Sequence, residues 1–188
     1  MPIVGIEPAV LPGARTTRTG VIGVMATTKT LASSKYRHLK AVAPENIRIL
    51  DCPCPGLMDC VEAGEFRTPH TMALLKTYVQ PLVAAGADTL VLGCTHYPFL
   101  ADAIRLAAGA GVRLIDPAPA VARQLKRRLD AAGLLNNTKK APGRIFCTTD
   151  ANEARERILR LLWTDNAVLQ ELPHPVMLSA ADPVFPAP

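Results

Sequence analysis

Cys94 and His96 stand two residues apart at the end of a short apolar run, Thr89 to Gly93, and just before Pro98. A thiol removes a proton only as its thiolate, and a nearby histidine or helix N-terminus favours that state. Since proline suits the first turn of a helix, the pattern predicts a strand, a sharp turn that holds the thiol, and a helix start. The backbone N–H groups of Thr95 and His96, with the Thr95 hydroxyl, suit a carboxylate. This one loop therefore has the groups for a base and for the anion of its substrate.

The chain has five cysteines, Cys52, Cys54, Cys60, Cys94 and Cys147. A cysteine after a strand is often only a small apolar filler, and this alternative stays open for Cys94 on the residues alone. Cys52 and Cys54 with Cys60 form a partial zinc pattern, but no fourth ligand has suitable spacing, so no metal site is expected. Structural or incidental roles are favoured for the other four cysteines. An odd number of cysteines in such a chain favours a reduced, cytoplasmic protein over a disulfide scaffold.

The composition is that of a globular protein, with 49% hydrophobic and 20% charged residues in a chain of 188. The net charge of +5 has its densest cluster at Lys126-Arg127-Arg128, and aromatic residues make up only 4%. A nucleic-acid surface shows more clustering and more stacking rings, so we interpret the charge as solvated helix faces. No apolar run approaches the roughly 20 residues that span a bilayer, and residues 1–5 lack the pattern of a secretory signal. We therefore expect neither a nucleic-acid nor a membrane partner.

Short apolar runs alternate with helical patterns along the chain, which predicts an α/β fold with a largely parallel sheet built of βαβ units. Ligands of such sheets bind beyond the carboxyl ends of the strands, where Cys94 lies. A loop is expected around Pro12 and a turn over 51–56. Asp116 and Asp150 are expected to cap the helices that follow them. The expected strands cover residues 3–6, 20–25, 47–50, 89–93, 112–115 and 144–148, and the expected helices about 30–42, 57–63, 69–85, 98–108, 118–131 and 151–163.

The segment Gly93-Cys94-Thr95-His96-Tyr97-Pro98 closely resembles the second catalytic motif of glutamate racemases, which belong to the aspartate/glutamate racemase superfamily. The resemblance extends over about residues 2 to 163. Residues 4–9 are similar to the segment that joins the two lobes of the family, and residues 20–27 to the opening strand of the second lobe. Further similar segments are Cys54 to Leu57 with Val61-Glu62, Leu114 to Ala118 with Val121-Ala122, and Phe146 to Asp150.

This resemblance implies a cofactor-independent isomerase that interconverts L- and D-glutamate for peptidoglycan synthesis. In the family, two cysteines face opposite sides of the substrate α-carbon; one removes the α-proton and the other returns a proton. By position, Cys94 is one of this pair, the one expected to act on L-glutamate, and His96 is its acid/base helper. Glu62 falls where the family has an assisting glutamate. Thr95 and His96 are expected to bind the substrate carboxylate, and Thr27 to line the pocket.

The first lobe of the family carries an Asp-Ser-Gly turn and a Cys-Asn-Thr motif with the other catalytic cysteine, and neither occurs in this sequence. The resemblance therefore implies one complete racemase lobe plus an incomplete second lobe, with a single catalytic thiol that is not expected to racemise at normal rates. Residues 1–17 would be a remnant of the N-terminal lobe and linker, and 18–117 the second lobe with the Gly-Cys-Thr-His-Tyr-Pro motif. Residues 118–163 would return to the first lobe, and 164–188 would form a Pro-rich mobile tail.

Other functions remain open at this point. The chain could be a non-catalytic racemase fragment that binds a ligand or a partner, or a related racemase for aspartate or a hydantoin. Tyr97-Pro98 after the histidine favours glutamate. An incomplete lobe would leave an open sheet edge and unburied faces on the helices at 118–131 and 151–163, which predicts a homodimer or other self-association.

Overall fold

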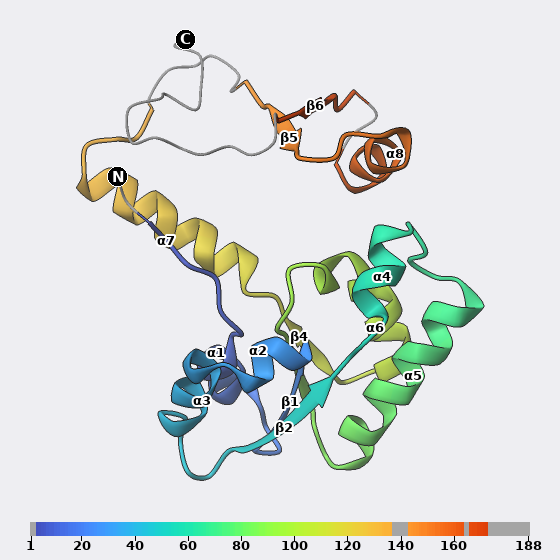
Figure 1. Cartoon of the computed structure of the whole chain (residues 1–188). Helices are drawn as coiled ribbons and strands as arrows, with labels where there is room; N and C mark the ends of the chain where they lie inside the picture. The colour runs from blue at the N-terminus through green and yellow to red at the C-terminus, as the bar shows by residue number, and fades with distance from the viewer. Residues whose placement is uncertain (1–2, 137–142, 164–165, 173–188) are drawn as a thin grey trace. The chain divides into compact units, whose positions relative to one another are not determined.

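The computed structural model describes residues 3–136, 143–163 and 166–172 (Figure 1). It separates into two compact units, Met1–Asn137 and Thr138–Pro188. The helix over 118–131 falls within the first unit, whereas the sequence grouped it with the strand and helix that follow. The finer division of the chain at residues 17, 117 and 163 stays a prediction.

The first unit is built on a parallel sheet of four strands in the order β2-β1-β3-β4. The strands are β1 (Val21–Ala26), β2 (Arg48–Pro53), β3 (Thr89–Leu92) and β4 (Arg113–Ile115). β1 and β3 are buried almost throughout, as central strands covered by helices on both faces should be. The predicted α/β fold with a parallel sheet is confirmed. Because all four strands run the same way, their carboxyl ends share one edge of the sheet.

Helices cover both faces of this sheet (Figure 1). Side chains of β1 alternate between the two faces: Ile22 and Val24 join the core that includes Tyr36, while Gly23 faces Leu82. A Cβ atom at Gly23 would lie 2.8 Å from Leu82, so the missing side chain admits that helix close to the sheet. The helices are α1 (Val10–Thr16), α2 (Thr28–Ala32) and α3 (Ser34–Ala41) on one side, and α4 (Leu57–Glu62), α5 (Pro69–Ala84), the 3₁₀ turn η1 (Tyr97–Leu100) and α6 (Ala101–Ala108) on the other.

Two predictions near the N-terminus are wrong. Residues 3–6 form no strand, and Ile3 is 82% exposed. The loop expected around Pro12 is helix α1 instead. Pro12 lies in the first turn of this helix, where its missing N–H removes no hydrogen bond. A Cβ atom at Gly13 would lie 2.8 Å from Val91, so the glycine lets the helix pack directly on β3.

Other boundaries differ from the prediction as well, three of them near the candidate site. The helix expected over 30–42 is two helices, because the Ser33 hydroxyl accepts the N–H of Tyr36 at 3.2 Å and starts α3 there. The turn expected over 51–56 begins later, since β2 pairs with β1 as far as Pro53. The helix expected from Pro98 starts as the 3₁₀ turn η1 and becomes α-helical only at α6.

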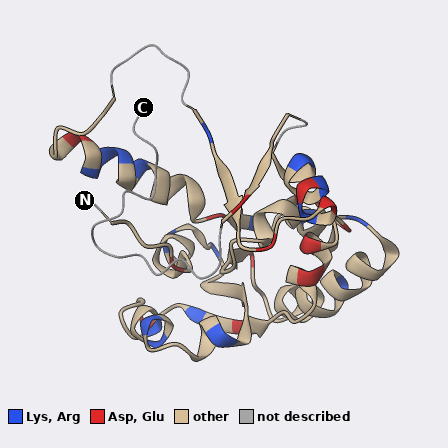
Figure 2. Cartoon of the chain, turned by 45° about the horizontal axis from the view of Figure 1, so that its top comes forward, with Lys and Arg blue, Asp and Glu red and all other residues tan. Residues whose placement is uncertain are grey.

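Helix α7 (Ala118–Ala131) closes the first unit. The N-cap position is held by Pro117 rather than by the predicted Asp116, whose carboxylate accepts the N–H of Ala118 at 2.8 Å from one residue further out. Val121, Leu125 and Leu129 recur at helical spacing, yet no residue of α7 is buried. Basic residues run along the same helix (Figure 2).

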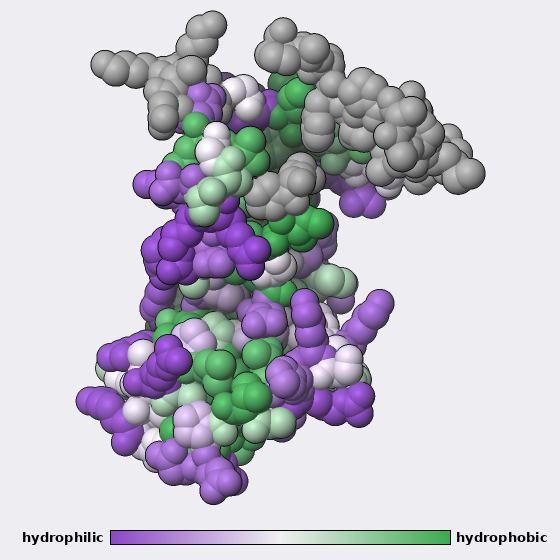
Figure 3. Space-filling model, turned by 90° about the vertical axis from the view of Figure 1, so that its left-hand side faces the viewer, coloured by the Kyte–Doolittle hydropathy of each residue, from purple (hydrophilic) through white to green (hydrophobic). Residues whose placement is uncertain are grey.

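A hollow of about 320 Å³ lies between α7 and the N-terminal segment. Figure 3 faces the side of Figure 1 that carries α1, α3 and α7, and it shows hydrophobic residues at the surface of the first unit beside hydrophilic ones. The hydrophobic lining of the hollow includes Val4, Pro8, Leu11, Leu39 and Val121.

The second unit holds β5 (Phe146–Thr148), α8 (Glu153–Leu162) and β6 (Leu169–Glu171). β5 and β6 pair in parallel, and the rings of Phe146 and Trp163 meet edge to face with centroids 5.6 Å apart. β6 lies within the 164–188 range that was expected to be a mobile tail; residues 164–165 and 173–188 of that range lie outside the described residues. None of the helices in the described part of the chain is both long and apolar enough to cross a membrane.

The predicted cap of α8 is wrong. Asn152, rather than Asp150, accepts the backbone N–H of Arg155, at 3.0 Å. Asp150 instead accepts from the guanidinium of Arg155 at 3.0 and 3.1 Å. Either side chain has the short acceptor that a cap requires, so the sequence alone could not decide which one the backbone would place at the helix start.

Candidate active site

Gly93 fixes the place where the chain leaves the sheet. Its N–H donates to the carbonyl oxygen of Met25 at 2.7 Å, so β3 follows β1 for one residue more. A Cβ atom at Gly93 would lie 2.9 Å from the Cβ of Ala26 and 3.0 Å from the Met25 oxygen, and real Cβ atoms do not tolerate such contacts. Glycine therefore allows the two strand ends to meet here, and Cys94 follows directly at the carboxyl edge of the sheet.

Cys94, His96 and Glu62 form a row of polar contacts. The Sγ atom of Cys94 lies 3.8 Å from Nδ1 of His96, and Nε2 of the same ring lies 2.7 Å from Oε1 of Glu62. A carboxylate at Nε2 favours the tautomer with its proton on that nitrogen, which leaves Nδ1 as an acceptor facing the thiol. The side chains of His96 and Glu62 are 27% and 54% exposed, so protons on this row can exchange with solvent.

Tyr97 anchors the loop that carries these groups. It is fully buried, its N–H donates to the carbonyl of Cys94 at 3.2 Å, and its hydroxyl donates to the carbonyl of Cys54 at 3.2 Å. Burial raises the pKa of Tyr97, with smaller contributions from the nearby thiols. The ring therefore stays neutral and serves to hold the loop rather than to exchange protons.

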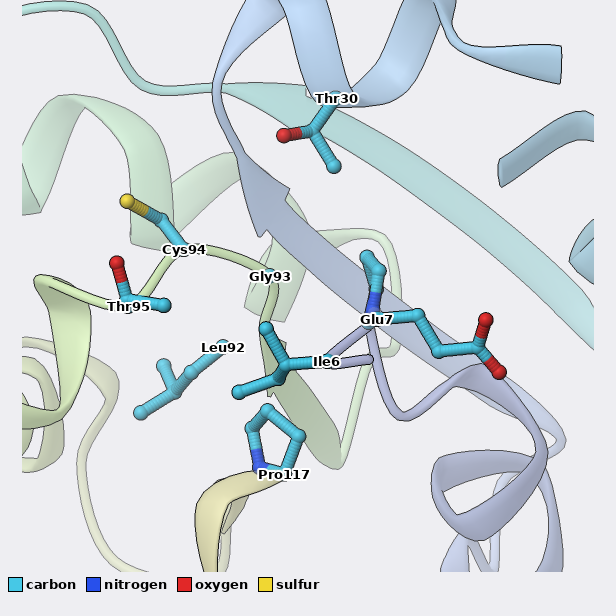
Figure 4. A pocket seen from close by; sticks show the side chains of 9 residues that line it. Ile6, Glu7, Thr30, Leu92, Gly93, Cys94, Thr95 and Pro117 are labelled. Atoms are coloured by element: carbon cyan, nitrogen blue, oxygen red, sulfur yellow. The ribbon is translucent and has the colours of Figure 1, made fainter. Parts of the chain in front are cut away.

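A cavity of about 220 Å³ opens beside Cys94 (Figure 4). Its volume is below the roughly 300–1,000 Å³ of pockets for drug-sized ligands and suits a smaller molecule. In Figure 4 the sulfur of Cys94 and the hydroxyl of Thr95 lie side by side, while the carboxylate of Glu7 points away from them. The lining comprises Ile6, Glu7 and Pro8 of the N-terminal segment, Thr30 of α2, residues 92–95, and Pro117.

The predicted residues divide into two groups. Cys94 and Thr95 line the cavity, whereas His96 and Glu62 stand behind Cys94 in the row of contacts. Thr27 is not part of the lining: its hydroxyl accepts the N–H of Thr30 at 3.2 Å and caps α2. The roles of all five residues stay predictions.

Two lining residues with polar side chains, Thr30 and Glu7, were missed by the sequence analysis. Thr30 lies one turn beyond Thr27, and the hydroxyls of the two residues are 2.9 Å apart. The signal was present, because a residue three positions after a strand-end cap lies over the same edge of the sheet. Glu7 belongs to a segment that was expected to be a strand and a linker, and nothing in its local pattern indicated a place beside Cys94. Within the described residues, no three His, Cys, Asp or Glu side chains gather as a metal site would require.

The family model described as Asp/Glu/Hydantoin racemase matches residues 1–125. Over 174 residues the chain is 45% identical to a protein named glutamate racemase from Pseudomonas entomophila, a match that covers 92% of this chain and 64% of that protein. It is 47% identical over 162 residues to a glutamate racemase from Pseudomonas putida, covering 86% of this chain and 61% of that protein. The chain thus spans less than two thirds of the length of these curated relatives.

Solved structures give the same likeness. A glutamate racemase isoform from Bacillus anthracis superposes with a TM-score of 0.78 at 30% identity and covers 94% of this chain and 66% of that one. The glutamate racemase of Escherichia coli, solved with L-glutamate and the activator UDP-MurNAc-Ala, gives 0.76 at 28% identity, with 91% and 64% covered. The parallel α/β architecture of this chain is that of these proteins.

Proposed function

The chain belongs to the Asp/Glu/hydantoin racemase family, and from this premise we propose that it carries one half of the proton-transfer machinery of a glutamate racemase. The observation that carries the proposal is the row Cys94–His96–Glu62, which ends at a small cavity. Relatives named glutamate racemases, at 45% and 47% identity, support glutamate over aspartate or a hydantoin as the substrate. The enzyme would be a cofactor-independent isomerase, because thiols can carry the proton without another group.

Cys94 is the base in this proposal. Its thiolate removes the α-proton of L-glutamate, and Nδ1 of His96, at 3.8 Å, accepts the proton from the thiol and passes it to solvent. Glu62 holds the imidazole in the required tautomer through its 2.7 Å contact. The Thr95 hydroxyl and the loop N–H groups bind the substrate carboxylate next to the reacting thiol. Thr30 completes the polar side of the site, and the Thr27 hydroxyl, 2.9 Å from that of Thr30, holds it in place.

A single thiol serves a single face of the α-carbon. Inversion needs a second acid on the opposite face, and Cys94 is the sole cysteine that lines the cavity within the described residues. The chain by itself should therefore exchange the α-proton of L-glutamate with retention of configuration, while D-glutamate presents its proton to the other side. Full racemisation is proposed only for an enzyme that contains a second proton donor.

The test is isotope exchange. Purified chain is incubated with L- or D-glutamate in heavy water, deuterium at the α-carbon is measured by mass spectrometry, and optical activity by circular dichroism. We expect deuterium to enter L-glutamate while its optical activity is kept. Absence of deuterium from both enantiomers would overturn the proposal, and racemisation at an ordinary enzymatic turnover would overturn the claim that one thiol serves one face.

Substitutions show which residues carry out the exchange of the α-proton. His96→Asn should lower it by about 10²-fold, the usual contribution of a positioned acid/base group. Glu62→Gln should lower it by less, because it acts only through His96. Cys147→Ser is the matched control, since this thiol is exposed and lies in the second unit.

The product and the site of action complete the proposal. D-glutamate made by such an enzyme would serve peptidoglycan synthesis, hence cell-wall biogenesis and cell shape, in the cytoplasm. Self-association is proposed as well, because α7 has no buried residue and its Leu125 is 41% exposed. Within the described residues β2 and β4 are the edge strands of the sheet, where a homodimer contact could add a strand.

A further inference from the structure

A second pair of thiols lies at the end of β2, apart from the row that contains Cys94. Cys52 and Cys54 flank Pro53, and side chains two residues apart in an extended segment point to the same side. Their Sγ atoms are 3.7 Å apart, and the Cys54 thiol also donates to the carbonyl oxygen of Cys52 at 3.2 Å. The two sulfur atoms are therefore almost in contact while both are reduced.

The two thiols are not equivalent. Cys54 is 2% exposed, whereas Cys52 is half-buried and within reach of a small molecule. The hydrogen bond from Cys54 lowers the pKa of Cys52 against the opposing effect of burial, and the same bond together with burial raises the pKa of Cys54. In its thiol form Cys52 donates only a long 3.6 Å bond to the carbonyl of Tyr78, which deprotonation gives up at little cost. Cys52 thus has the character of an attacking thiolate and Cys54 that of the resolving thiol.

We propose that Cys52 and Cys54 are a redox-active pair that reduces a hydroperoxide and closes into a reversible disulfide. The thiolate of Cys52 attacks the terminal peroxide oxygen, the O–O bond breaks, and the leaving alkoxide takes a proton from solvent, which leaves a sulfenic acid on Cys52. The sulfur of Cys54 then attacks the sulfenic sulfur, the S–O bond breaks, and water leaves with the Cys54 proton. The pair loses two electrons, and the hydroperoxide is reduced to an alcohol and water.

The bridge would join the last part of β2 to Cys54, the residue that follows the strand. Two residues of strand span about 6.6 Å between Cα atoms at a rise of about 3.3 Å per residue. This separation lies within the roughly 4.4–6.8 Å that a disulfide joins, near its upper end. The Sγ atoms have to close from 3.7 Å to about 2.05 Å. Because parallel side chains hold their Cβ atoms about as far apart as the Cα atoms, and a disulfide needs about 3.5–4.5 Å between Cβ atoms, the backbone at Cys54 has to shift as the bridge forms.

The pair is also joined to the loop of the candidate site. The N–H of Cys54 donates to Ala26 at 3.1 Å, and its carbonyl accepts the hydroxyl of Tyr97 at 3.2 Å. A shift of Cys54 on oxidation would therefore change the hydrogen bond that holds Tyr97, the residue that follows His96. The redox chemistry itself does not depend on the proposed proton transfer at Cys94.

The experiment uses the full chain with Cys94→Ser and Cys147→Ser, so that only Cys52, Cys54 and Cys60 remain. The folded protein is exposed to hydrogen peroxide, free thiols are counted after denaturation, and the tryptic peptide 49–67, which holds all three, is weighed. We expect two of the three thiols to be lost, the peptide to become lighter by two hydrogen atoms, and dithiothreitol to restore both. Cys60→Ser, which removes a buried thiol of the same peptide, should leave this result unchanged.

Single replacements separate the two roles. With Cys54→Ser, Cys52 should stop at a sulfenic acid that dimedone traps, and no disulfide should form. With Cys52→Ser, oxidation of Cys54 should be at least about tenfold slower, because that thiol is buried and protonated. Three intact thiols after an exposure that oxidises Cys94 in the unsubstituted chain would overturn the proposal, as would loss of the disulfide with Cys60→Ser. A disulfide that forms equally fast in urea-unfolded chain would also contradict it, since the folded geometry would then play no part.

Discussion

The four-stranded sheet and helix α7 belong to one unit and both carry apolar residues at the spacing of their element, yet they differ in burial. Ile22, Val24 and Leu90 of the sheet are fully buried, whereas α7 has no buried residue and Leu125 is 41% exposed. The apolar runs predicted buried strands, whereas the incomplete lobe predicted an unburied face on the helix over 118–131. The central strands of the sheet are therefore packed between helices and position the candidate site, while the apolar stripe of α7 has no comparable cover within the described residues.

The largest difference is expected for core truncation. Leu90→Ala should cost about 3 kcal/mol of unfolding free energy, because it opens a cavity in a fully buried site of β3. Leu125→Ala, the same change on α7, should cost less than about 1 kcal/mol, since Leu125 stays 41% exposed and its truncation leaves no closed cavity. Urea unfolding of both variants measures this contrast. Equal losses of unfolding free energy would mean that α7 is packed as tightly as the sheet, which would contradict the difference in burial between them.

Asp88, just before β3, should give the next largest effect. Partial burial opposes its ionisation, but hydrogen bonds from the Thr17 hydroxyl at 2.5 Å and the Arg18 N–H at 2.8 Å, with others from Thr89 and Thr19, lower the pKa of Asp88 to about 2. Because the folded pKa lies below the ordinary value of 3.8, the carboxylate stabilises the fold above about pH 4. That stability is lost as the pH falls from about 4 towards 2.

Asp88→Asn should therefore cost roughly 2 kcal/mol at neutral pH and flatten the acid limb of the stability curve between about pH 4 and pH 2. Asp102→Asn is the control, because that carboxylate is 69% exposed and pairs only at the surface. Chemical unfolding at several pH values checks both. If Asp88→Asn left the acid limb unchanged, the hydrogen bonds from the α1–β1 turn to the Asp88 carboxylate would not stabilise the fold.

A smaller loss of unfolding free energy is expected at the hydrogen bond between Tyr97 and Cys54, which joins the loop of the candidate site to the end of β2. Tyr97→Phe removes the hydroxyl that donates to the carbonyl of Cys54 and should cost about 1 kcal/mol, because a buried acceptor loses its partner. Tyr78→Phe removes an equivalent bond, from a hydroxyl to the carbonyl of Pro55, at an exposed position and should cost less than about 0.5 kcal/mol. Thermal unfolding of the pair gives the comparison, and a larger loss for Tyr78→Phe would contradict the anchoring role of Tyr97.

The smallest change in unfolding free energy is expected for a substitution on α7, and self-association is the second property measured there. Leu125→Lys should leave the unfolding free energy within about 0.5 kcal/mol of the parent, because the position is exposed. It should also weaken any self-association through the apolar stripe, which sedimentation at several protein concentrations would detect. Lys126→Glu changes a neighbouring charge on the same helix and serves as the control. Stronger association of Leu125→Lys would show that this face does not mediate it.

Elements set by local interactions could be predicted from the sequence, whereas elements set by contacts between residues far apart in the chain could not. The turn from Gly93 to Pro98 could be predicted because its strand, glycine and proline signals are local. Helix α1 could not, since Pro12 and Gly13 indicate a loop and only the contact of Gly13 with Val91, far along the chain, explains why glycine suits a helix there. The approach of Glu62 to His96 joins residues 34 apart, and no spacing rule predicts it; only the resemblance to a known family pointed to Glu62.

The most direct test of the central claim is the uptake of deuterium by L-glutamate in heavy water with the parent chain and with Cys94→Ser. We expect exchange at the α-carbon to fall by at least about 10²-fold in Cys94→Ser, since the hydroxyl cannot replace a thiolate as the base. Cys147→Ser should exchange at the parental rate. Equal exchange by the parent and Cys94→Ser would contradict the claim that this loop carries the proton-transfer thiol.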